Sequence, residues 1–398
     1  MEYSKKSVTS VDVKGKKVLL RCDFNIPLDK ETGEITDEGR ITASLKTINY
    51  LLDNGAAVIA CSHLGRPKGQ WNEKLSLKVV AERLSQLLGR EVKMAKDVIG
   101  EDAKLLAARL QPGEIMLLEN LRFHKEEEAN DPQFARALAS MADIYVSDSF
   151  GTAHRAHAST AGVADYLPAY SGFLLAKELR LLGGALTSPL RPFVAILGGA
   201  KVSDKLGVIR SLLDKADTLI LGGAMAYTFI KAQGGEIGAS LCEEEELDYA
   251  REMLGKAKKN GVRFLLPPDT VCAKEFKSTP EHITVDSYHI PEGMIGLDIG
   301  PKTIALYQDA IMKAATVIWN GPMGVFEFPE YEKGTHDIAE AMARTEAVTI
   351  IGGGDSVAAA RQFGYADQIT LISTGGGASL EFLEGKALPG VTCLLDKE

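Results

Sequence analysis

Arginine and histidine follow four short apolar runs in the first half of the chain, each directly after the run ends. Arginine suits carboxylate and phosphate, because its planar fork donates two parallel hydrogen bonds. The carboxyl ends of parallel strands meet along one edge of a sheet, where ligands bind. These loops therefore predict a site for a small anion at one edge. The four loops are Arg21–Pro27, Ser62–Pro67, Glu119–His124 and Asp148–His157.

Acceptors accompany these basic groups. Asp23 and Asn25 lie two residues apart, on one side of an extended segment, and suit a substrate hydroxyl. Arg40 falls in the loop that follows, and His63 stands beside Arg66 as a further donor to an anion. Together these types favour a small hydroxylated anion as the ligand.

A histidine pair in the last of these loops raises the possibility of a metal. His154 and His157 are three residues apart, but no third ligand has a recognisable spacing. We therefore disfavour a zinc site. The remaining histidines of the second half have no motif around them and are expected to be structural.

Glycine dominates the corresponding positions in the second half. Glycine lets a phosphate approach the backbone, whose N–H groups and the following helix N-terminus bind negative charge. Five such clusters predict a nucleotide-phosphate site. They are Gly198–Lys205, Gly222–Ala224, Asn320–Gly324, Gly352–Ser356 and Thr374–Ser379.

The two common nucleotide motifs are missing from these loops. The sequence contains neither G-x-x-x-x-G-K-[ST] nor G-x-G-x-x-G, so neither a P-loop nor a dinucleotide fingerprint supports the nucleotide site. Asp355 is the candidate for Mg²⁺, which prefers one or two carboxylates together with phosphate oxygens. Lys201 and Lys205 are four residues apart, which predicts one face of the helix that leaves the first glycine loop.

Short β-branched runs alternate with longer amphipathic stretches along the whole chain. This alternation predicts right-handed crossovers and parallel sheets with both faces covered. Eleven expected strands suit two sheets. They are Lys17–Arg21, Ala57–Cys61, Glu91–Ala95, Ile115–Leu118, Ile144–Ser147, Phe193–Leu197, Thr218–Leu221, Arg263–Leu266, Thr316–Trp319, Val348–Ile351 and Thr370–Ser373. Expected helices include Leu75–Leu88, Pro132–Ala142, Glu243–Asn260 and Glu332–Arg344.

A helix around Phe173–Gly184 marks the expected domain boundary. A Gly-Gly pair closes it, and the proline-containing segment Thr187–Pro192 follows. We predict an α/β protein with two doubly wound, Rossmann-like parallel-sheet domains joined by this hinge helix. The expected ranges are 1–172 for the anion-binding domain, 173–186 for the helix and 187–379 for the nucleotide-binding domain.

Composition limits the partners. With 45 Lys and Arg against 54 Asp and Glu, the net charge of −9 argues against nucleic acid. No apolar stretch reaches the roughly 18 residues that span a bilayer, and Met1–Leu20 does not read as a signal peptide. The five cysteines are scattered and never spaced as CxxC, which predicts reduced thiols. We expect a cytoplasmic monomer that binds small molecules and neither nucleic acid nor membrane.

Several of these strings resemble phosphoglycerate kinases. The resemblance runs in order from about residue 8 to the C-terminus. Its strings are Arg21–Pro27, Ser62–Pro67, Leu118–Glu128, Phe150–Thr160, Gly198–Lys205, Trp319–Glu327, Gly352–Ser356 and Ser373–Gly390. The departures are Ile26 where Val is usual, Lys46 where Pro is frequent and Ser149 where Ala is common. None of them removes a charged or metal-binding group.

The resemblance implies a reaction and assigns residues to it. ADP and 1,3-bisphosphoglycerate would give ATP and 3-phosphoglycerate, reversibly and with Mg²⁺. The glycerate-binding residues would be Asp23, Asn25, Arg40, His63, Arg66, Arg122 and Arg155. The nucleotide-binding residues would be Lys205, Gly296, Glu327, Gly353, Gly354, Asp355 and Ser356. Glu327 would contact the ribose, Gly296 the base and Asp355 the metal. Arg40 and Lys201 would flank the phosphoryl group in flight, and residues 380–398 would return to the first domain.

Two alternatives from other classes stay open at this stage. An NAD-dependent dehydrogenase would need a dinucleotide fingerprint, which the sequence lacks. A non-catalytic, two-lobed anion-binding protein would normally carry an export signal and would consume no nucleotide.

Overall fold

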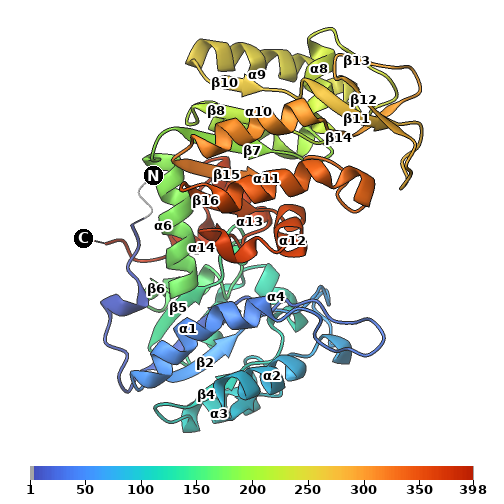
Figure 1. The fold of residues 1–398 in the computed structure, drawn as a ribbon. Helices are drawn as coiled ribbons and strands as arrows, with labels where there is room; N and C mark the ends of the chain where they lie inside the picture. The colour runs from blue at the N-terminus through green and yellow to red at the C-terminus, as the bar shows by residue number, and fades with distance from the viewer. Residues whose placement is uncertain (1–3, 398) are drawn as a thin grey trace. The chain divides into compact units, whose positions relative to one another are not determined.

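The chain forms two compact units in the computed structural model, which describes residues 4–397 (Figure 1). Within these residues the first unit comprises 4–180 and 387–397, and the second comprises 181–386. No helix among them is both long and apolar enough to cross a lipid bilayer.

A six-stranded parallel sheet forms the centre of the first unit, in the order β3-β4-β2-β1-β5-β6. Its strands are β1 (Lys17–Cys22), β2 (Ala57–Cys61), β3 (Val92–Met94), β4 (Ile115–Leu117), β5 (Ile144–Asp148) and β6 (Ala169–Ser171). Nearly every residue of β1, β2 and β5 is buried, as strands covered on both faces require. This burial explains the continuous apolar runs of the sequence.

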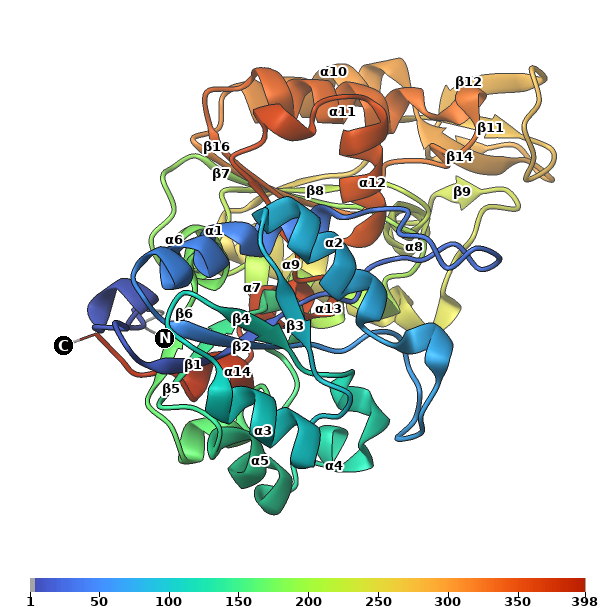
Figure 2. The same cartoon turned by 90° about the horizontal axis from the view of Figure 1, so that it is seen from below.

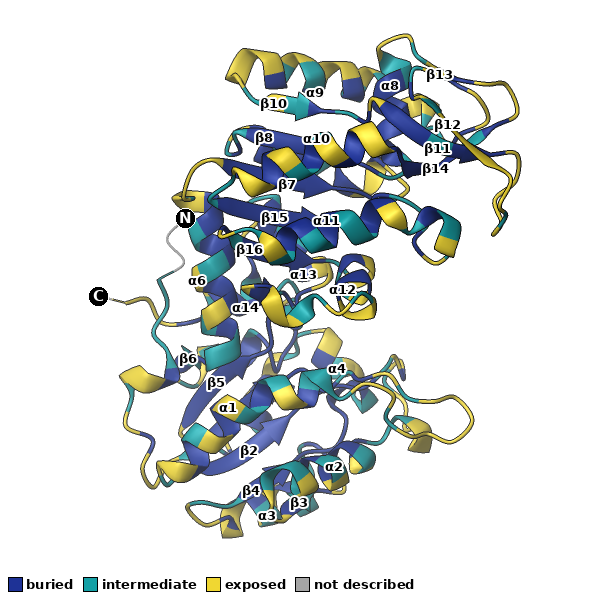
Figure 3. Cartoon of the chain, viewed as in Figure 1, coloured by how far each residue is buried: buried dark blue, intermediate teal, exposed yellow. Residues whose placement is uncertain are grey.

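Helices cover both faces of this sheet. They are α1 (Gly39–Asp53), α2 (Lys78–Leu88), α3 (Glu101–Arg109), α4 (Lys125–Glu128) and α5 (Pro132–Ala139). Alternate strand residues such as Val18 and Leu20 pack in one core with apolar residues of α1 and α2. Figure 2 shows α3 and α5 on the opposite side of the sheet, and Figure 3 shows that helices such as α1 carry both buried and exposed residues. Asp131 starts α5 by accepting hydrogen bonds from the backbone N–H groups of Gln133 and Phe134.

The second unit repeats the plan with its own parallel sheet, in the order β10-β8-β7-β15-β16-β17. Its strands are β7 (Phe193–Leu197), β8 (Thr218–Leu221), β10 (Arg263–Leu265), β15 (Thr316–Asn320), β16 (Val348–Gly352) and β17 (Leu371–Ile372). The helices are α7 (Leu206–Leu212), α8 (Met225–Ala232), α9 (Leu247–Asn260), α10 (Pro301–Met312), α11 (Lys333–Arg344), α12 (Gly354–Gln362) and α13 (Gly377–Leu383). The two parallel sheets confirm the predicted α/β class.

Smaller strands were not predicted. They are β9 (Glu236–Ile237), β11 (Asp269–Ala273), β12 (His282–Asp286), β13 (His289–Ile290) and β14 (Ile295–Ile299). Antiparallel β12, β11 and β14 form a separate sheet. All residues of β12 except one are exposed, so it lacks the apolar run by which buried strands are recognised.

The joining helix α6 (Phe173–Thr187) is anchored to the first unit by its first turn. The Asp148 carboxylate, at the end of β5, accepts hydrogen bonds from Leu174 N–H at 2.9 Å and Leu175 N–H at 3.2 Å. Thr47 of α1 accepts from Phe173 N–H at 3.0 Å. Two elements of the first unit, β5 and α1, therefore hold the start of this helix.

Residues 387–397 belong to the first unit although α13 belongs to the second. They include α14 (Pro389–Thr392). Gly390 N–H donates to Ala153 O at 2.8 Å, and Leu395 N–H donates to Ala169 O at 3.0 Å. Leu395 O in turn accepts from Lys6 N–H at 2.7 Å. The last described residues are thus built into the first unit by backbone hydrogen bonds.

We expect Asp148→Asn to make stability less dependent on pH. Burial raises the pKa of Asp148 to about 6, whereas the same group has a pKa of 3.8 when solvated. The folded state then holds the proton more tightly, so stability is lost as pH rises through this window. Asparagine keeps the accepting oxygen and does not titrate. Relative to the parent, its free energy of unfolding should rise by about 2 kcal/mol between about pH 4 and pH 7.

Urea unfolding of both proteins at the two pH values measures this difference. Asp29→Asn is the control, because backbone hydrogen bonds lower the pKa of the exposed Asp29. Its relative stability should move in the opposite direction. A difference between Asp148→Asn and parent that stays constant with pH would contradict the prediction.

Candidate active site

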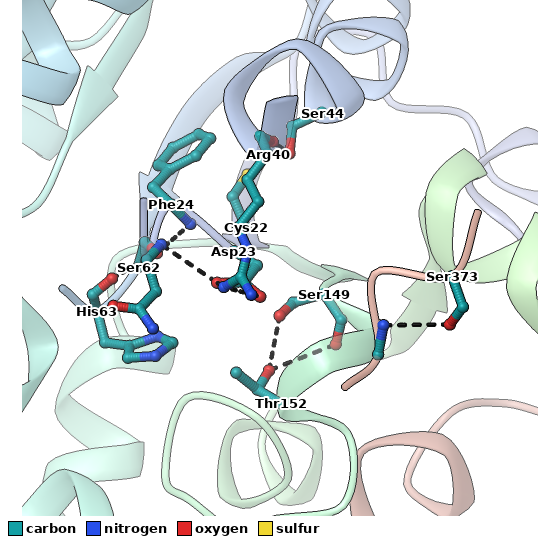
Figure 4. A network of polar contacts seen from close by, with 12 residues as sticks. Cys22, Asp23, Phe24, Arg40, Ser44, Ser62, His63, Ser149, Thr152 and Ser373 are labelled. Atoms are coloured by element: carbon teal, nitrogen blue, oxygen red, sulfur yellow. Dashed lines mark hydrogen bonds and ion pairs between the residues drawn. The ribbon is translucent and has the colours of Figure 1, made fainter. Parts of the chain in front are cut away.

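An ion pair between Asp23 and Arg40 lies at the end of β1. Nη1 of Arg40 is 3.0 Å from both carboxylate oxygens of Asp23. Figure 4 draws the two side chains. The Asp23 side chain is 9% exposed and that of Arg40 is 38% exposed. Arg40 is the second residue of α1, so its predicted place in a loop is wrong. The first turn of a helix fixes its backbone, and a buried carboxylate fixes its guanidinium.

The loop after β2 carries His63, Gly65 and Arg66. His63 is buried, and Arg66 is exposed nearer the tip of the loop. Asn25, from the loop after β1, accepts from Gly65 N–H at 2.8 Å and so ties the two loops together. Gly65 has a φ of +62°, and a Cβ there would lie 2.8 Å from Leu75, so this turn requires glycine.

Arg122 provides a buried guanidinium from the short 3₁₀ turn after β4. Its Nη1 donates to Gly65 O at 2.9 Å, and its Nε is 3.5 Å from the Glu128 carboxylate. Its Nη2 is buried with no hydrogen-bond partner among residues 4–397. A buried donor without a partner is costly, so this atom indicates where an anion would be bound.

Arg155, His154 and His157 complete a group of basic side chains with Arg40, His63 and Arg122, which we call the arginine rim. Arg155 Nε is 3.2 Å from His154 Nε2. The pKa of His63 is held well below its usual value, first by burial and then by the charges of Arg21, Arg122, Arg40 and Arg155. Burial and neighbouring arginines also lower the pKa of His157 to about 4. The structure thus brings Asp23, Arg40, His63, Arg122 and Arg155 together, and Asn25 and Arg66 lie on the same two loops as Asp23 and His63.

Arg21 was not predicted as a site residue. It is 1% exposed, and its Nη2 is 3.1 Å from His63 Nδ1. The sequence feature that could have identified Arg21 is its position one residue before the end of an apolar strand. A buried charge without partners would be costly there.

In the second unit, Lys205 lies at the centre of the glycine loops. It is 8% exposed, and its ammonium donates to Gly198 O at 2.5 Å and Asn320 O at 2.8 Å. Burial lowers its pKa to about 8, against the charges of Asp204 and Asp355. The predicted helix face shared with Lys201 is wrong. Ser203–Lys205 form a 3₁₀ turn, α7 begins after it, and Lys201 is an exposed loop residue.

The glycine loops pack backbone against backbone. A Cβ on Gly198 would lie 2.0 Å from Pro322 O, so this approach excludes any other residue. Ser356 is buried, and its Oγ accepts from Gly321 N–H at 2.5 Å. The side-chain Nδ2 of Asn320 is buried and has no partner in the described chain.

Asp355 lies in the first turn of α12 and is exposed. Gly353, with a φ of +88°, turns the chain into this helix, and Gly354 is its first residue. A helix N-terminus favours negative charge, so phosphate oxygens suit this position.

Gly296 and Glu327 lie elsewhere in the second unit. Gly296 N–H donates to Ser240 Oγ at 2.9 Å, and a Cβ on Gly296 would collide with Tyr227. Glu327 is exposed. No hydrogen bond or ion pair within 4–397 links either residue to Asp355. β14 (Ile295–Ile299), which carries Gly296, does contact the end of the Asn320–Gly324 loop, since Val325 N–H donates to Leu297 O at 2.8 Å.

Residues 4–397 contain no group of three or more His, Cys, Asp or Glu arranged to hold a metal. The absence of such a cluster is compatible with Mg²⁺, which keeps several waters and takes one or two carboxylates together with substrate phosphates. An exposed Asp355 beside phosphate-binding backbone is such a carboxylate, so the residues present fit the ion.

Comparisons with known proteins agree with this geometry. The family model described as phosphoglycerate kinase matches residues 8–386. Phosphoglycerate kinases of Clostridium novyi and Clostridium botulinum (strain Alaska E43) are 58% and 59% identical, over all of this chain and all of each relative. The solved structure of phosphoglycerate kinase from Coxiella burnetii has a TM-score of 0.91 at 41% identity. That from Pyrococcus horikoshii has a TM-score of 0.83 at 33% identity. Each covers 98% of both chains. From the full-length match and the shared fold, this chain belongs to the phosphoglycerate kinase family.

Proposed function

We propose that this phosphotransferase binds its glycerate substrate at the arginine rim of the first unit. The nucleotide is bound by the glycine loops of the second unit, and Mg²⁺ is held there by Asp355. The family's reaction moves a phosphoryl group between 1,3-bisphosphoglycerate and ADP, giving 3-phosphoglycerate and ATP. The observation that carries the assignment is the unpartnered, buried Nη2 of Arg122 within a cluster of arginines.

The rim suits a molecule with an anionic group at each end. The charges of Arg122 and Arg155 act on His63, and Arg40 is anchored by Asp23. Arginine donates in pairs to carboxylate or phosphate. Asn25 and Arg66, on the same two loops as Asp23 and His63, complete the proposed glycerate set.

The loops of the second unit suit a chain of phosphates. Lys205 supplies a buried positive charge, and Gly353, Gly354 and Ser356 shape the entry to α12. Asp355 would hold Mg²⁺, which would supply positive charge to neutralise the phosphates. We propose that Gly296 lies against the base and Glu327 against the ribose.

Phosphoryl transfer requires in-line positioning and charges matched to the three equatorial oxygens, with little covalent help from the protein. Arg40 and Lys201 are the two cations that we place beside the transferring group. Neither needs to accept a proton or form a bond. Their contribution is a charge held in place before the reaction begins.

The assignment is tested by a coupled assay with ADP, 1,3-bisphosphoglycerate and titrated Mg²⁺. We expect no turnover after chelation and a higher Mg²⁺ requirement in Asp355→Asn. The control is Asp367→Asn, which changes a carboxylate of the same unit outside the glycine loops. An unchanged Mg²⁺ dependence in Asp355→Asn would exclude Asp355 as the ligand.

Arg155→Ala should mainly raise the KM for 3-phosphoglycerate. Arg155 is half-buried beside His154, where its charge acts on the bound substrate in ground state and transition state alike. Loss of such uniform binding raises KM and leaves kcat nearly unchanged. Initial rates at varied 3-phosphoglycerate and saturating ATP measure it. A large fall in kcat with constant KM would place Arg155 at the reacting end instead.

We further propose that the two units close on each other when both substrates are bound. In-line attack needs reacting atoms about 3–3.5 Å apart, and each substrate is assigned to a different unit. The proposed boundaries are 1–172, a hinge helix 173–186 and 187–379, with 380–398 returning to the first domain.

Closure should reduce the radius of gyration measured by small-angle X-ray scattering when both ligands are saturating. Each ligand alone is the control and should produce a smaller change. A radius that stays constant in the ternary complex would count against closure.

We also propose that the protein is a cytoplasmic monomer. Light scattering would test the oligomeric state, and cell fractionation would test the location.

A further inference from the structure

A buried chain of polar groups runs from Glu127 to His63. Ser159 Oγ is 2.5 Å from Glu127 Oε1, and Ser159 N–H donates to Glu127 Oε2 at 2.9 Å. Arg21 Nε donates to the same Ser159 Oγ at 2.9 Å. Arg21 Nη1 donates to Cys22 O, and Arg21 Nη2 is 3.1 Å from His63 Nδ1. All four side-chain residues are buried, and Glu127 and Ser159 are 0% exposed.

The direction of each hydrogen bond in this chain follows from its chemistry. Arginine is always protonated and has no acceptor, so Arg21 must donate at both ends. Ser159 Oγ accepts from Arg21 and donates its own hydrogen to the Glu127 carboxylate. At the other end, His63 Nδ1 must be the acceptor. A neutral imidazole whose Nδ1 accepts carries its proton on Nε2.

The surrounding charges keep this imidazole neutral. Arg21, Arg122, Arg40 and Arg155 all face His63, and each opposes a second proton. Its Nε2 makes no hydrogen bond within residues 4–397. A neutral ring with a free Nε2–H beside several arginines is a donor suited to an anionic substrate.

We infer that Arg21, Ser159 and Glu127 form a positioning relay that fixes His63 as the Nε2–H tautomer, which then donates to the glycerate substrate. The relay explains why a charged pair is buried behind the rim, where desolvation is expensive. Glu127 balances Arg21, and Arg21 sets the tautomer. The last step, donation to substrate, rests on the proposed glycerate site.

Nuclear magnetic resonance of protein labelled with ¹⁵N-histidine tests the tautomer directly. Correlations between ring nitrogens and carbon-bound protons distinguish a protonated nitrogen from a bare one, and His63→Gln identifies the signals of His63. We expect a protonated Nε2 and a bare Nδ1, unchanged down to about pH 5, where an ordinary histidine is charged. A protonated Nδ1 in the parent enzyme would overturn the inference without any variant.

The double variant Arg21→Met/Glu127→Gln removes both buried charges together, since removal of one would strand the other. We expect His63 to show both tautomers and the KM for 3-phosphoglycerate to rise about tenfold, with nucleotide KM unchanged. The matched control is Lys93→Met/Glu114→Gln, which removes an ion pair of 2.6 Å in the same unit. It should change neither quantity. A single Nε2–H tautomer persisting without Arg21 would overturn the relay.

A double-mutant cycle separates the relay from general weakening of the site. In a His63→Gln background, the Arg21/Glu127 double variant should raise KM by less than about twofold further. An undiminished effect there would overturn action through His63. Failure of the proposed glycerate site is distinguished by titration with 3-phosphoglycerate. If the His63 signals have the expected tautomer yet do not move, donation to substrate is excluded while the tautomer assignment stands.

Discussion

Lys201→Ala is expected to lower kcat by roughly 10²-fold or more, with little change in either KM. Negative charge in the transition state spreads over three oxygens of a group that belongs to neither substrate. A cation that meets those oxygens only in transit lowers the barrier without tightening either ground state. Lys201 is exposed on the loop between β7 and the Ser203–Lys205 turn, and it is free to reach such a group.

The loop that carries Lys201 is nevertheless held in place. The Glu243 carboxylate accepts hydrogen bonds from Val202 N–H at 2.5 Å and from Ser203 N–H at 3.1 Å. The backbone one residue after Lys201 is therefore fixed. Because its backbone is fixed, the Lys201 side chain loses less conformational freedom when its ammonium reaches the phosphoryl group. This is the requirement for preorganisation.

Lys205→Ala is the matched comparison. Its ammonium is buried against Gly198 O and Asn320 O, so its removal takes a donor from both carbonyl groups, although Asn320 O still accepts from Gly198 N–H at 3.0 Å. We expect weaker nucleotide binding together with a lower free energy of unfolding. Steady-state kinetics in both substrates and urea unfolding measure the two effects. Equal losses confined to nucleotide KM in both variants would refute separate roles for the lysines.

Arg40→Ala is the second substitution for which a large fall in kcat is expected, also roughly 10²-fold. Its Nη1 is occupied by Asp23, and the rest of the partly exposed guanidinium can face the transferring group. Asp23→Asn keeps the shape of the partner but removes its charge, so we expect a smaller fall in kcat as Arg40 loses its anchor.

Arg83→Ala is the control for Arg40→Ala, because Arg83 pairs with the neighbouring Glu38 at 2.6 Å. Its loss should leave kcat unchanged. Initial-rate kinetics at saturating substrates compare the three variants. If Arg40→Ala kept kcat within about twofold of the parent, its place beside the phosphoryl group would be wrong.

The sequence was sufficient for the parallel strands because their burial leaves a continuous apolar run. The bounds of β2, β7 and β8 were predicted without error. The three residues of β6 carry no such run. Exposed strands such as β12 depend on pairing with β11, which the residue pattern of the strand itself does not report.

The candidate site was predictable at the level of loops and less so at the level of contacts. Loops after strands were located because parallel strands end along one edge. Spacing alone suggested a shared helix face for Lys201 and Lys205, whereas the turn between them is 3₁₀ and one lysine is buried. The sequence predicts Arg21 only as part of its loop, because its contact with Ser159 joins residues 138 apart in sequence.

The return of residues 387–397 to the first unit has a consequence for biosynthesis. The ribosome makes these residues after the entire second unit, whose residues 181–386 are continuous in sequence. The second unit can therefore finish folding from one uninterrupted stretch of nascent chain. The first unit, made earlier, has to wait for Gly390 and Leu395 before its hydrogen bonds at Ala153 and Ala169 can form. The half of the enzyme that is translated first is thus the half that is completed last.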